Sequence, residues 1–156
     1  MGGTVKSILI LCGGHPFACD DGFGYHVAKR LWEMDLPENV ECMECGYSAS
    51  EFPDIIDGKD KMIFVDAFRS QKEPGTVLRM QPEEVELIVD GITDVPKLHL
   101  MELLHQIAIS GKCPETVFIG VVPKEINVAS EQLTPEIQSK IPEVIDLIMQ
   151  EITTED

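Results

Sequence analysis

The chain has 156 residues, a length typical of one domain, and 44% of its residues are hydrophobic. Its 12 Lys and Arg residues are outnumbered by 28 Asp and Glu residues, which gives a formal net charge of −16. Such a surface repels phosphate groups, which argues against nucleic-acid binding and against attachment to an anionic membrane. The longest apolar runs, SILILC and VFIGVV, are far shorter than the roughly 20 residues of a membrane span. We therefore expect no membrane insertion.

The cysteines and the first residues indicate the compartment. Residues MGGTVKS lack the apolar stretch of a secretory signal, and five cysteines are an odd number for a disulfide framework. These features predict free thiols and a cytoplasmic protein. Cys42 and Cys45 form a C-x-x-C pattern, but they fall in a predicted strand, where residues three apart point to opposite faces. No second pair accompanies them, which argues against a zinc or redox site.

The predicted elements alternate between strands and helices. Apolar, β-branched runs predict strands at 5–11, 40–45, 62–67, 76–80 and 116–121. Helical spacing of apolar residues predicts helices at 22–34, 50–56, 82–89, 98–110 and 135–152, of which those at 50–56 and 82–89 are short. The last helix is expected to be interrupted near Pro142. The connection before residue 76 is too short for a helical crossover. We therefore expect the strands at 62–67 and 76–80 to pair antiparallel.

This order of elements predicts an α/β fold, a three-layer sandwich with helices on both faces of a twisted, mostly parallel five-stranded sheet that has one antiparallel strand. We expect residues 1–156 to form a single domain. Ligands of such sheets bind beyond the carboxyl ends of the strands. Functional residues are therefore expected in the segments that directly follow the strands.

Acidic residues follow two of the predicted strands. The first strand leads into GGHPFACDDGFG, whose glycine spacing matches no phosphate-binding motif and whose two acids would repel a phosphate. One of them, most naturally Asp20, is expected to cap the next helix. Asp21 is then a candidate metal ligand or acid/base group. Asp66 ends the strand at 62–67 and is expected to face the same crevice.

A histidine could complete this site. His99 opens the helix predicted at 98–110, where a surface imidazole is as plausible as a ligand. His105 lies about 120° farther round that helix, so the two histidines cannot share one small site. Asp21, Asp66 and His99 would offer two oxygens and one nitrogen to a divalent metal. The chain has no H-E-x-x-H motif and no G-x-S-x-G serine elbow.

These residues resemble the hydrogenase maturation endopeptidases over nearly the whole chain. The family has a glycine loop and an Asp-Asp/Glu-x-x-Gly stretch after its first strand, here CGGHPFACDDGFG, then a strand ending in Asp-Ala, here at Asp66, and a helix beginning with His, here His99. The resemblance implies a hydrolase, a metal-dependent endopeptidase that removes the C-terminal extension of a nickel-iron hydrogenase large-subunit precursor after nickel insertion. It also implies that Asp21, Asp66 and His99 contact nickel supplied by that precursor, for which other divalent metals could substitute.

Two positions depart from the family pattern. The Asn of the family's first loop is His15 here, either an added donor or a simple substitution. The family's Asp-Gly-Gly-Thr loop after the second strand reads Glu-Cys-Gly-Tyr-Ser here, which keeps an acid at Glu44. His15, Glu44 and Asp20 are therefore possible accessory residues of the site. The changed loop leaves open which hydrogenase is processed.

Two other functions stay open from the sequence. A small-ligand-binding or nucleotide-binding α/β module is opposed by the two acids before the first helix. A nonproteolytic, metal-sensing chaperone would use the same donors as the peptidase. We expect the hydrogenase precursor as partner and a monomeric protein.

Overall fold

The computed structural model describes residues 5–46, 52–88, 109 and 114–153. Its strands are β1 (Ile8–Gly13), β2 (Val40–Gly46), β3 (Lys61–Ala67), β4 (Val77–Met80) and β5 (Glu115–Val121). A 3-10 turn, η1 (Cys19–Gly22), leads into α1 (Phe23–Trp32), and the other helices are α2 (Phe52–Ile56), α3 (Pro82–Ile88), α5 (Pro135–Gln138) and α6 (Ile141–Thr153). The predicted break near Pro142 is confirmed as the boundary between α5 and α6. The helix predicted at 98–110 lies outside the described residues except for residue 109.

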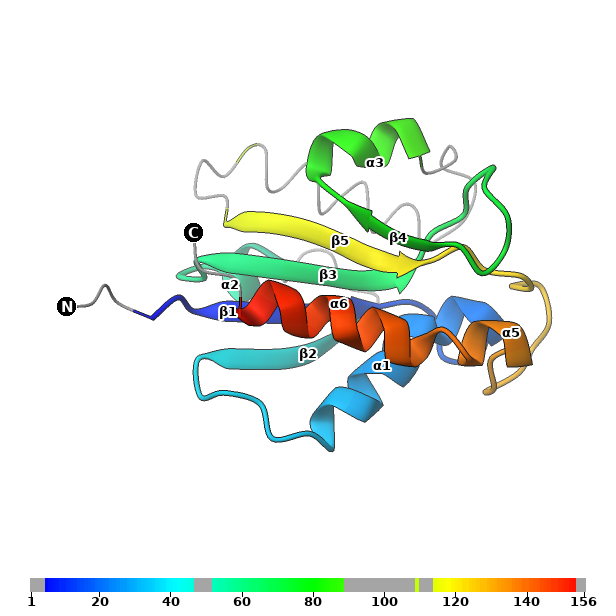
Figure 1. The fold of residues 1–156 in the computed structure, drawn as a ribbon, viewed down its shortest axis with the longest axis horizontal. Helices are drawn as coiled ribbons and strands as arrows, with labels where there is room; N and C mark the ends of the chain where they lie inside the picture. Colours follow the sequence, from blue (N-terminus) through cyan, green and yellow to red (C-terminus); the bar gives the residue numbers. More distant parts are fainter. Residues whose placement is uncertain (1–4, 47–51, 89–108, 110–113, 154–156) are drawn as a thin grey trace.

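The strands form one twisted sheet in the order β2-β1-β3-β5-β4 (Figure 1). Neighbouring strands are parallel except for β4, which runs antiparallel to β5. Every residue of β1 and β3 is buried, as expected for strands covered on both faces. The predicted fold class is confirmed.

The predicted pairing of the strands at 62–67 and 76–80 is wrong. β4 pairs with β5, because β3 already lies between β1 and β5. The connection from β3 to β4 passes the end of β5, where Gly75 N–H donates to Val122 O at 2.8 Å and Val122 N–H donates to Thr76 O at 2.9 Å. Both edges of β3 have parallel partners, so the chain has to continue to the outer edge of β5.

Helices cover both faces of the sheet and enclose two apolar cores. On one face, α1, α5 and α6 bury side chains such as Phe23, Ile137 and Ile148 against β1, β3 and β5. On the other face, α2 and α3 contribute Ile56 and Val85 to a second core. Figure 1 shows α1 and α6 side by side over the sheet. The assignment of all residues 1–156 to one domain stays a prediction.

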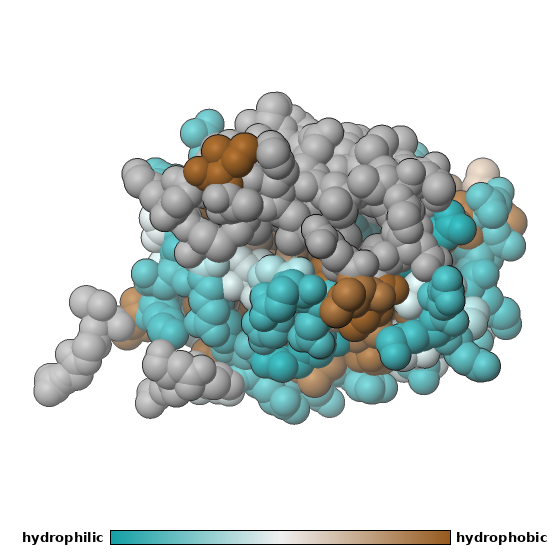
Figure 2. Space-filling view, turned by 90° about the horizontal axis from the view of Figure 1, so that it is seen from above, coloured by the Kyte–Doolittle hydropathy of each residue, from teal (hydrophilic) through white to brown (hydrophobic). Residues whose placement is uncertain are grey.

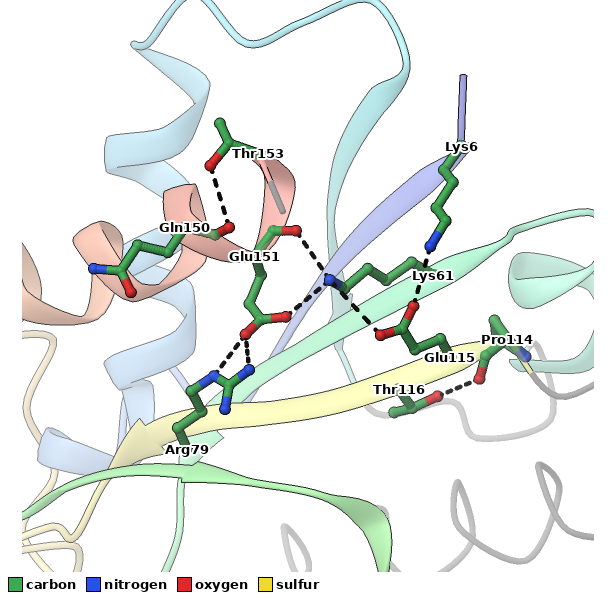
Figure 3. Close-up of polar contacts among 9 residues, drawn as sticks. All are labelled: Lys6, Lys61, Arg79, Pro114, Glu115, Thr116, Gln150, Glu151 and Thr153. Carbon is green, nitrogen blue, oxygen red and sulfur yellow. Dashed lines mark hydrogen bonds and ion pairs between the residues drawn. The ribbon is translucent and has the colours of Figure 1, made fainter. Parts of the chain in front are cut away.

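A charge network around the buried pair of Lys61 and Glu151 fastens α6 to the sheet near the amino end of β3 (Figure 3). Lys61 Nζ lies 2.8 Å from Glu151 Oε1 and donates to the Glu151 carbonyl at 2.9 Å. Arg79 donates to Glu151 Oε2 through Nε at 2.6 Å and also through a terminal nitrogen. Burial by itself raises the pKa of Glu151, but the hydrogen bonds and charges of Lys61 and Arg79 outweigh it, so the pKa is lowered.

On the face shown in Figure 2, the coloured surface is largely hydrophilic, with apolar side chains in separate patches. Phe17, Trp32 and Val128 are among the large apolar residues that are at least half exposed. Within the described part of the chain, no helix has the length and apolar character that crossing a membrane requires.

Candidate functional site

The carboxyl ends of β1 and β3 bring two of the predicted site residues together. Cys12 of β1 is in register with Val65 of β3, so the residues that follow them in the chain leave the sheet at the same edge. A Cβ atom built on Gly14 would lie 2.1 Å from the Asp21 carbonyl oxygen and 2.9 Å from Asp66 Oδ1. The two aspartates therefore pack against the same glycine. Gly14 has φ +113°, a conformation that side-chain-bearing residues rarely adopt.

Backbone groups orient both carboxylates. Asp21 is 6% exposed and Asp66 is 3% exposed. The His15 N–H donates to Asp21 Oδ2 at 3.1 Å, and the Ala67 N–H donates to Asp66 Oδ1 at 2.7 Å. A backbone N–H group thus orients each of the two carboxylates. That these two residues contact a metal stays a prediction.

Asp20 has a different environment from Asp21. The expectation that it caps the first helix is wrong, since neither η1 nor α1 has a side-chain hydrogen bond at its N-cap. Its fully buried carboxylate accepts the N–H groups of Lys124 at 3.0 Å and Glu125 at 2.8 Å. It also accepts the Thr134 N–H at 2.8 Å and the Thr134 hydroxyl at 3.0 Å. Asp20 therefore joins η1 to the segment after β5.

The other predicted site residues are placed in part. His15 is half-buried, and its Nδ1 accepts the Phe17 N–H at 3.1 Å. Glu44 is exposed on β2, opposite Cys12, near the same edge of the sheet. Their accessory roles stay predictions. His99 lies outside the described residues. Among the residues that the structure does describe, no three His, Cys, Asp or Glu side chains are grouped as a metal site.

A second glycine sets the position of the acidic turn. A Cβ built on Gly24 would lie 2.2 Å from Gly13 O and 2.7 Å from Val65 O. The absence of a side chain thus lets the start of α1 rest directly on β1 and β3, which draws η1 to the strand ends. No prediction from the sequence assigned this role to Gly24. The sequence feature that could have indicated the close packing is the pair of nearby glycines in DDGFG.

Cys42 has a partner that the C-x-x-C pattern does not suggest. It lies in β2, as predicted, and a hydrogen bond with Cys12 of β1 lowers the pKa of its thiol although burial opposes the change. Cys12 is fully buried, and Trp32 Nε1 donates to the Cys42 carbonyl at 3.0 Å. Cys12, Cys19 and Cys42 are free thiols, as predicted for the cysteines.

Residues 25–151 match the model of a family described as hydrogenase maturation protease. The chain belongs to this family. The chain is 32% identical over 151 residues to a protein of Methanocaldococcus jannaschii with the provisional name of a hydrogenase maturation protease, a match that covers 94% of this chain and 97% of the relative. It is 29% identical to the coenzyme F420 hydrogenase subunit delta of Methanothermobacter thermautotrophicus, covering 93% of this chain and 94% of that protein.

A solved structure of a hydrogenase maturation protease supports the same fold. The maturating endopeptidase HybD of Escherichia coli superposes with a TM-score of 0.84 at 24% identity, covering 93% of this chain and 91% of the other. The resemblance seen in the motifs is confirmed, and the protein is a peptidase and therefore a hydrolase. The family match begins at residue 25, after the acidic turn, whereas the similarity to the M. jannaschii protein extends over nearly the whole protease.

Proposed function

We propose that the protein removes the C-terminal extension from the large-subunit precursor of a nickel-iron hydrogenase after nickel insertion. In this proposal Asp21, Asp66 and His99 contact nickel that the precursor already holds, so that only a loaded precursor is cut. The observation that carries the proposal is the packing of Asp21 and Asp66 against Gly14 at the carboxyl edge of the sheet. Membership of the protease family supports the reaction.

The donor set suits a metal that arrives with the substrate. Two carboxylates from different strand ends offer oxygen atoms, and an imidazole nitrogen would give the set the borderline character that Ni²⁺ accepts. With two or three donors from the protease, the metal would keep coordination positions for the ligands that the precursor supplies. When bound, the metal would polarise the scissile carbonyl.

The protease's own residues fix where the substrate is held. The N–H groups of His15 and Ala67 keep the carboxylates of Asp21 and Asp66 in place before the substrate arrives. Such preorganisation lowers the cost of ordering the site on binding. The close approach of α1 to the sheet at Gly24 holds the acidic turn at the strand ends.

The test is incubation of the protein with a nickel-loaded precursor, followed by mass analysis of the precursor's C-terminus. Wild-type protein should release the extension, whereas Asp66→Asn and His99→Gln should release it far more slowly. Asp35→Asn, which alters an exposed acid after α1, is the matched control and should process normally. Equal cleavage of nickel-free precursor would contradict the sensing of nickel.

The same experiment separates a chaperone from a protease. One relative bears the name of a hydrogenase subunit, so association without cleavage is the alternative to test. A chaperone would co-elute with the loaded precursor in gel filtration and leave its mass unchanged. Release of the extension by wild-type protein identifies the protease.

We further propose a cytoplasmic, monomeric protein. The free thiols of Cys12, Cys19 and Cys42, the cysteines whose state the structure describes, support a reducing compartment. The mass of the free protein in solution, measured by light scattering, tests the monomer, and fractionation of cells tests the compartment.

A further inference from the structure

A pocket of about 360 Å³ lies between the loop after β3 and the loop after β5. β3 and β5 are neighbours whose last residues, Ala67 and Val121, are in register. Both loops therefore begin at the edge of the sheet that also carries Asp66, beyond the arrowheads of β3 and β5 in Figure 1. Arg69 follows Asp66 by three residues, a reach of at most about 11 Å along the chain.

The pocket is basic although the protein is strongly acidic. Of the 12 Lys and Arg residues of a chain with net charge −16, three line this pocket, namely Arg69, Lys72 and Lys124. Glu125 is the acidic residue of the lining, and its Oε2 accepts the Asn127 N–H at 2.8 Å. Lys124 also lies 3.7 Å from Glu136, in a pair whose side chains are 58% and 46% exposed. Exposed pairs of this kind exchange partners readily.

The pocket is a fixed part of the fold. Its wall at Lys124 and Glu125 is held by the buried carboxylate of Asp20, one residue before Asp21. The opposite loop is tied to the end of β5 by the bonds between Gly75, Val122 and Thr76. The backbone of both loops, from which the three cations extend, is therefore held at the edge of the sheet that carries Asp66.

We propose that this pocket binds a carboxylate of the substrate polypeptide, about three residues from the point held at the aspartates. The proposal rests on the proposed function, since it places the substrate at Asp21 and Asp66. An extended peptide rises about 3.3 Å per residue, so three residues span about 10 Å, close to the upper limit of the distance between Asp66 and Arg69. Arg forms paired hydrogen bonds with a carboxylate, and lysines add charge. The aspartates at one site and the cations of the pocket at the other would together set the register of a bound peptide.

The carboxylate can come from an acidic side chain or from the end of the chain, and two peptides distinguish these sources. Hexaglutamate with an amidated C-terminus offers only side-chain carboxylates, and hexaglutamine with a free C-terminus offers only the terminal one. Each is titrated into full-length protein while NMR follows the backbone amides of Ser70 and Asn127. We expect saturable shifts with one of the peptides at low ionic strength, and loss of these shifts at high salt.

Matched variants assign the binding to the pocket. Arg69→Gln combined with Lys124→Gln should abolish the shifts, and Lys72→Gln should weaken them. Lys29→Gln combined with Arg30→Gln removes the same charge from exposed positions of α1 and should leave them unchanged. Thermal melts check that each variant is folded, and Lys72→Gln keeps the test valid should the double variant be unfolded. No saturable shift with either peptide, or equal loss in the α1 control, would overturn the proposal.

Processing gives a separate readout. With the nickel-loaded precursor, Arg69→Gln/Lys124→Gln should raise KM about tenfold with little change in kcat, because solvent-exposed charge pairs contribute about that much to binding. An unchanged KM would overturn the pocket's role for the precursor. Failure of wild-type protein to cut the precursor would contradict the proposed function, while the peptide titration would still decide whether the pocket binds carboxylates.

Discussion

The two ends of the sheet hold buried charge in different ways. Near the amino end, Lys61 and Arg79 surround the carboxylate of Glu151 with positive charge. At the carboxyl edge, Asp20 instead accepts hydrogen bonds from backbone amides and a hydroxyl, and a backbone N–H orients each of Asp21 and Asp66. Ion pairs join separate elements and neutralise the charge of the carboxylate. Backbone amides fix the direction of a carboxylate without neutralising its charge.

This difference separates stability from function. The Glu151 network links α6 to β3 and β4, so its loss should lower stability with little effect on the reaction. The aspartates lie where strand ends meet, so their loss should affect the reaction first. Variants at the two ends can therefore break or sharpen the distinction.

The largest effect is expected at Glu151. Glu151→Ala removes the nearer carboxylate of buried Lys61 and leaves the more distant Glu115 at 4.0 Å, which should lower the free energy of unfolding by about 3 kcal/mol. Urea denaturation at pH 7 measures the change. Asp146→Ala, at an exposed position of α6, should change it by less than about 0.5 kcal/mol. If the folded Glu151→Ala protein lost processing altogether, the two ends would not be independent.

The next effect concerns the reaction. Asp21→Asn keeps the shape of the side chain and removes its charge, so processing of the loaded precursor should slow by more than about 100-fold, since loss of groups outside the metal's ligands already gives 10–100-fold. The melting temperature should shift by less than about 4 °C. Asp54→Asn, an exposed acid of α2, is the control for charge alone. Normal processing by Asp21→Asn would remove Asp21 from the site.

Gly14 tests the packing of the two aspartates. Gly14→Ala would place a Cβ 2.1 Å from the Asp21 carbonyl oxygen, so processing should fall and stability should drop by about 1–3 kcal/mol from backbone strain. Gly58 also has a positive φ, +78°, but a Cβ there would meet nothing within 4 Å. Gly58→Ala should therefore lose some stability and keep full processing. Equal processing by both variants would show that the contact at Gly14 is unimportant.

The smallest effect is a pH dependence at the amino end. The folded protein lowers the pKa of Glu151 from 4.5, so this group's contribution to stability is present above pH 4.5 and is lost as the pH falls through the lowered value. The difference in unfolding free energy between wild type and Glu151→Gln should therefore shrink as the pH falls from 7 towards 3. Urea titrations at several pH values measure it, and a constant difference would contradict the assigned pKa direction.

Local sequence patterns predicted the strands of the sheet and the position of Asp66 at a strand end. The apolar runs of β3 and β5 are strong strand signals. The position of Asp66 near the carboxyl end of β3 could be predicted because it comes directly after such a run. The meeting of Asp21 with Asp66 was expected because parallel strands end at one edge. His99, a candidate from its place at the start of the helix predicted at 98–110 and then from the family pattern, lies outside the described residues.

Long-range partners could not be predicted in the same way. The groups that bind Asp20 are 104 to 114 residues away in the chain, so no local pattern distinguishes its role from that of a helix cap. The partner of β4 depends on which edges of the sheet are already occupied, a property of the whole sheet. The basic pocket joins Arg69 to Lys124 across two loops, which spacing along the chain does not show.

The bonds of Asp20 also restrict how family members can be recombined. A chimera that imports another relative's residues 14–22 but retains the native 123–134 would set the aspartate of a foreign turn against amides arranged around the carboxylate of this one. Exchange of both stretches together preserves the match. Libraries intended to redirect the enzyme to a different hydrogenase should therefore move the two stretches as a single cassette.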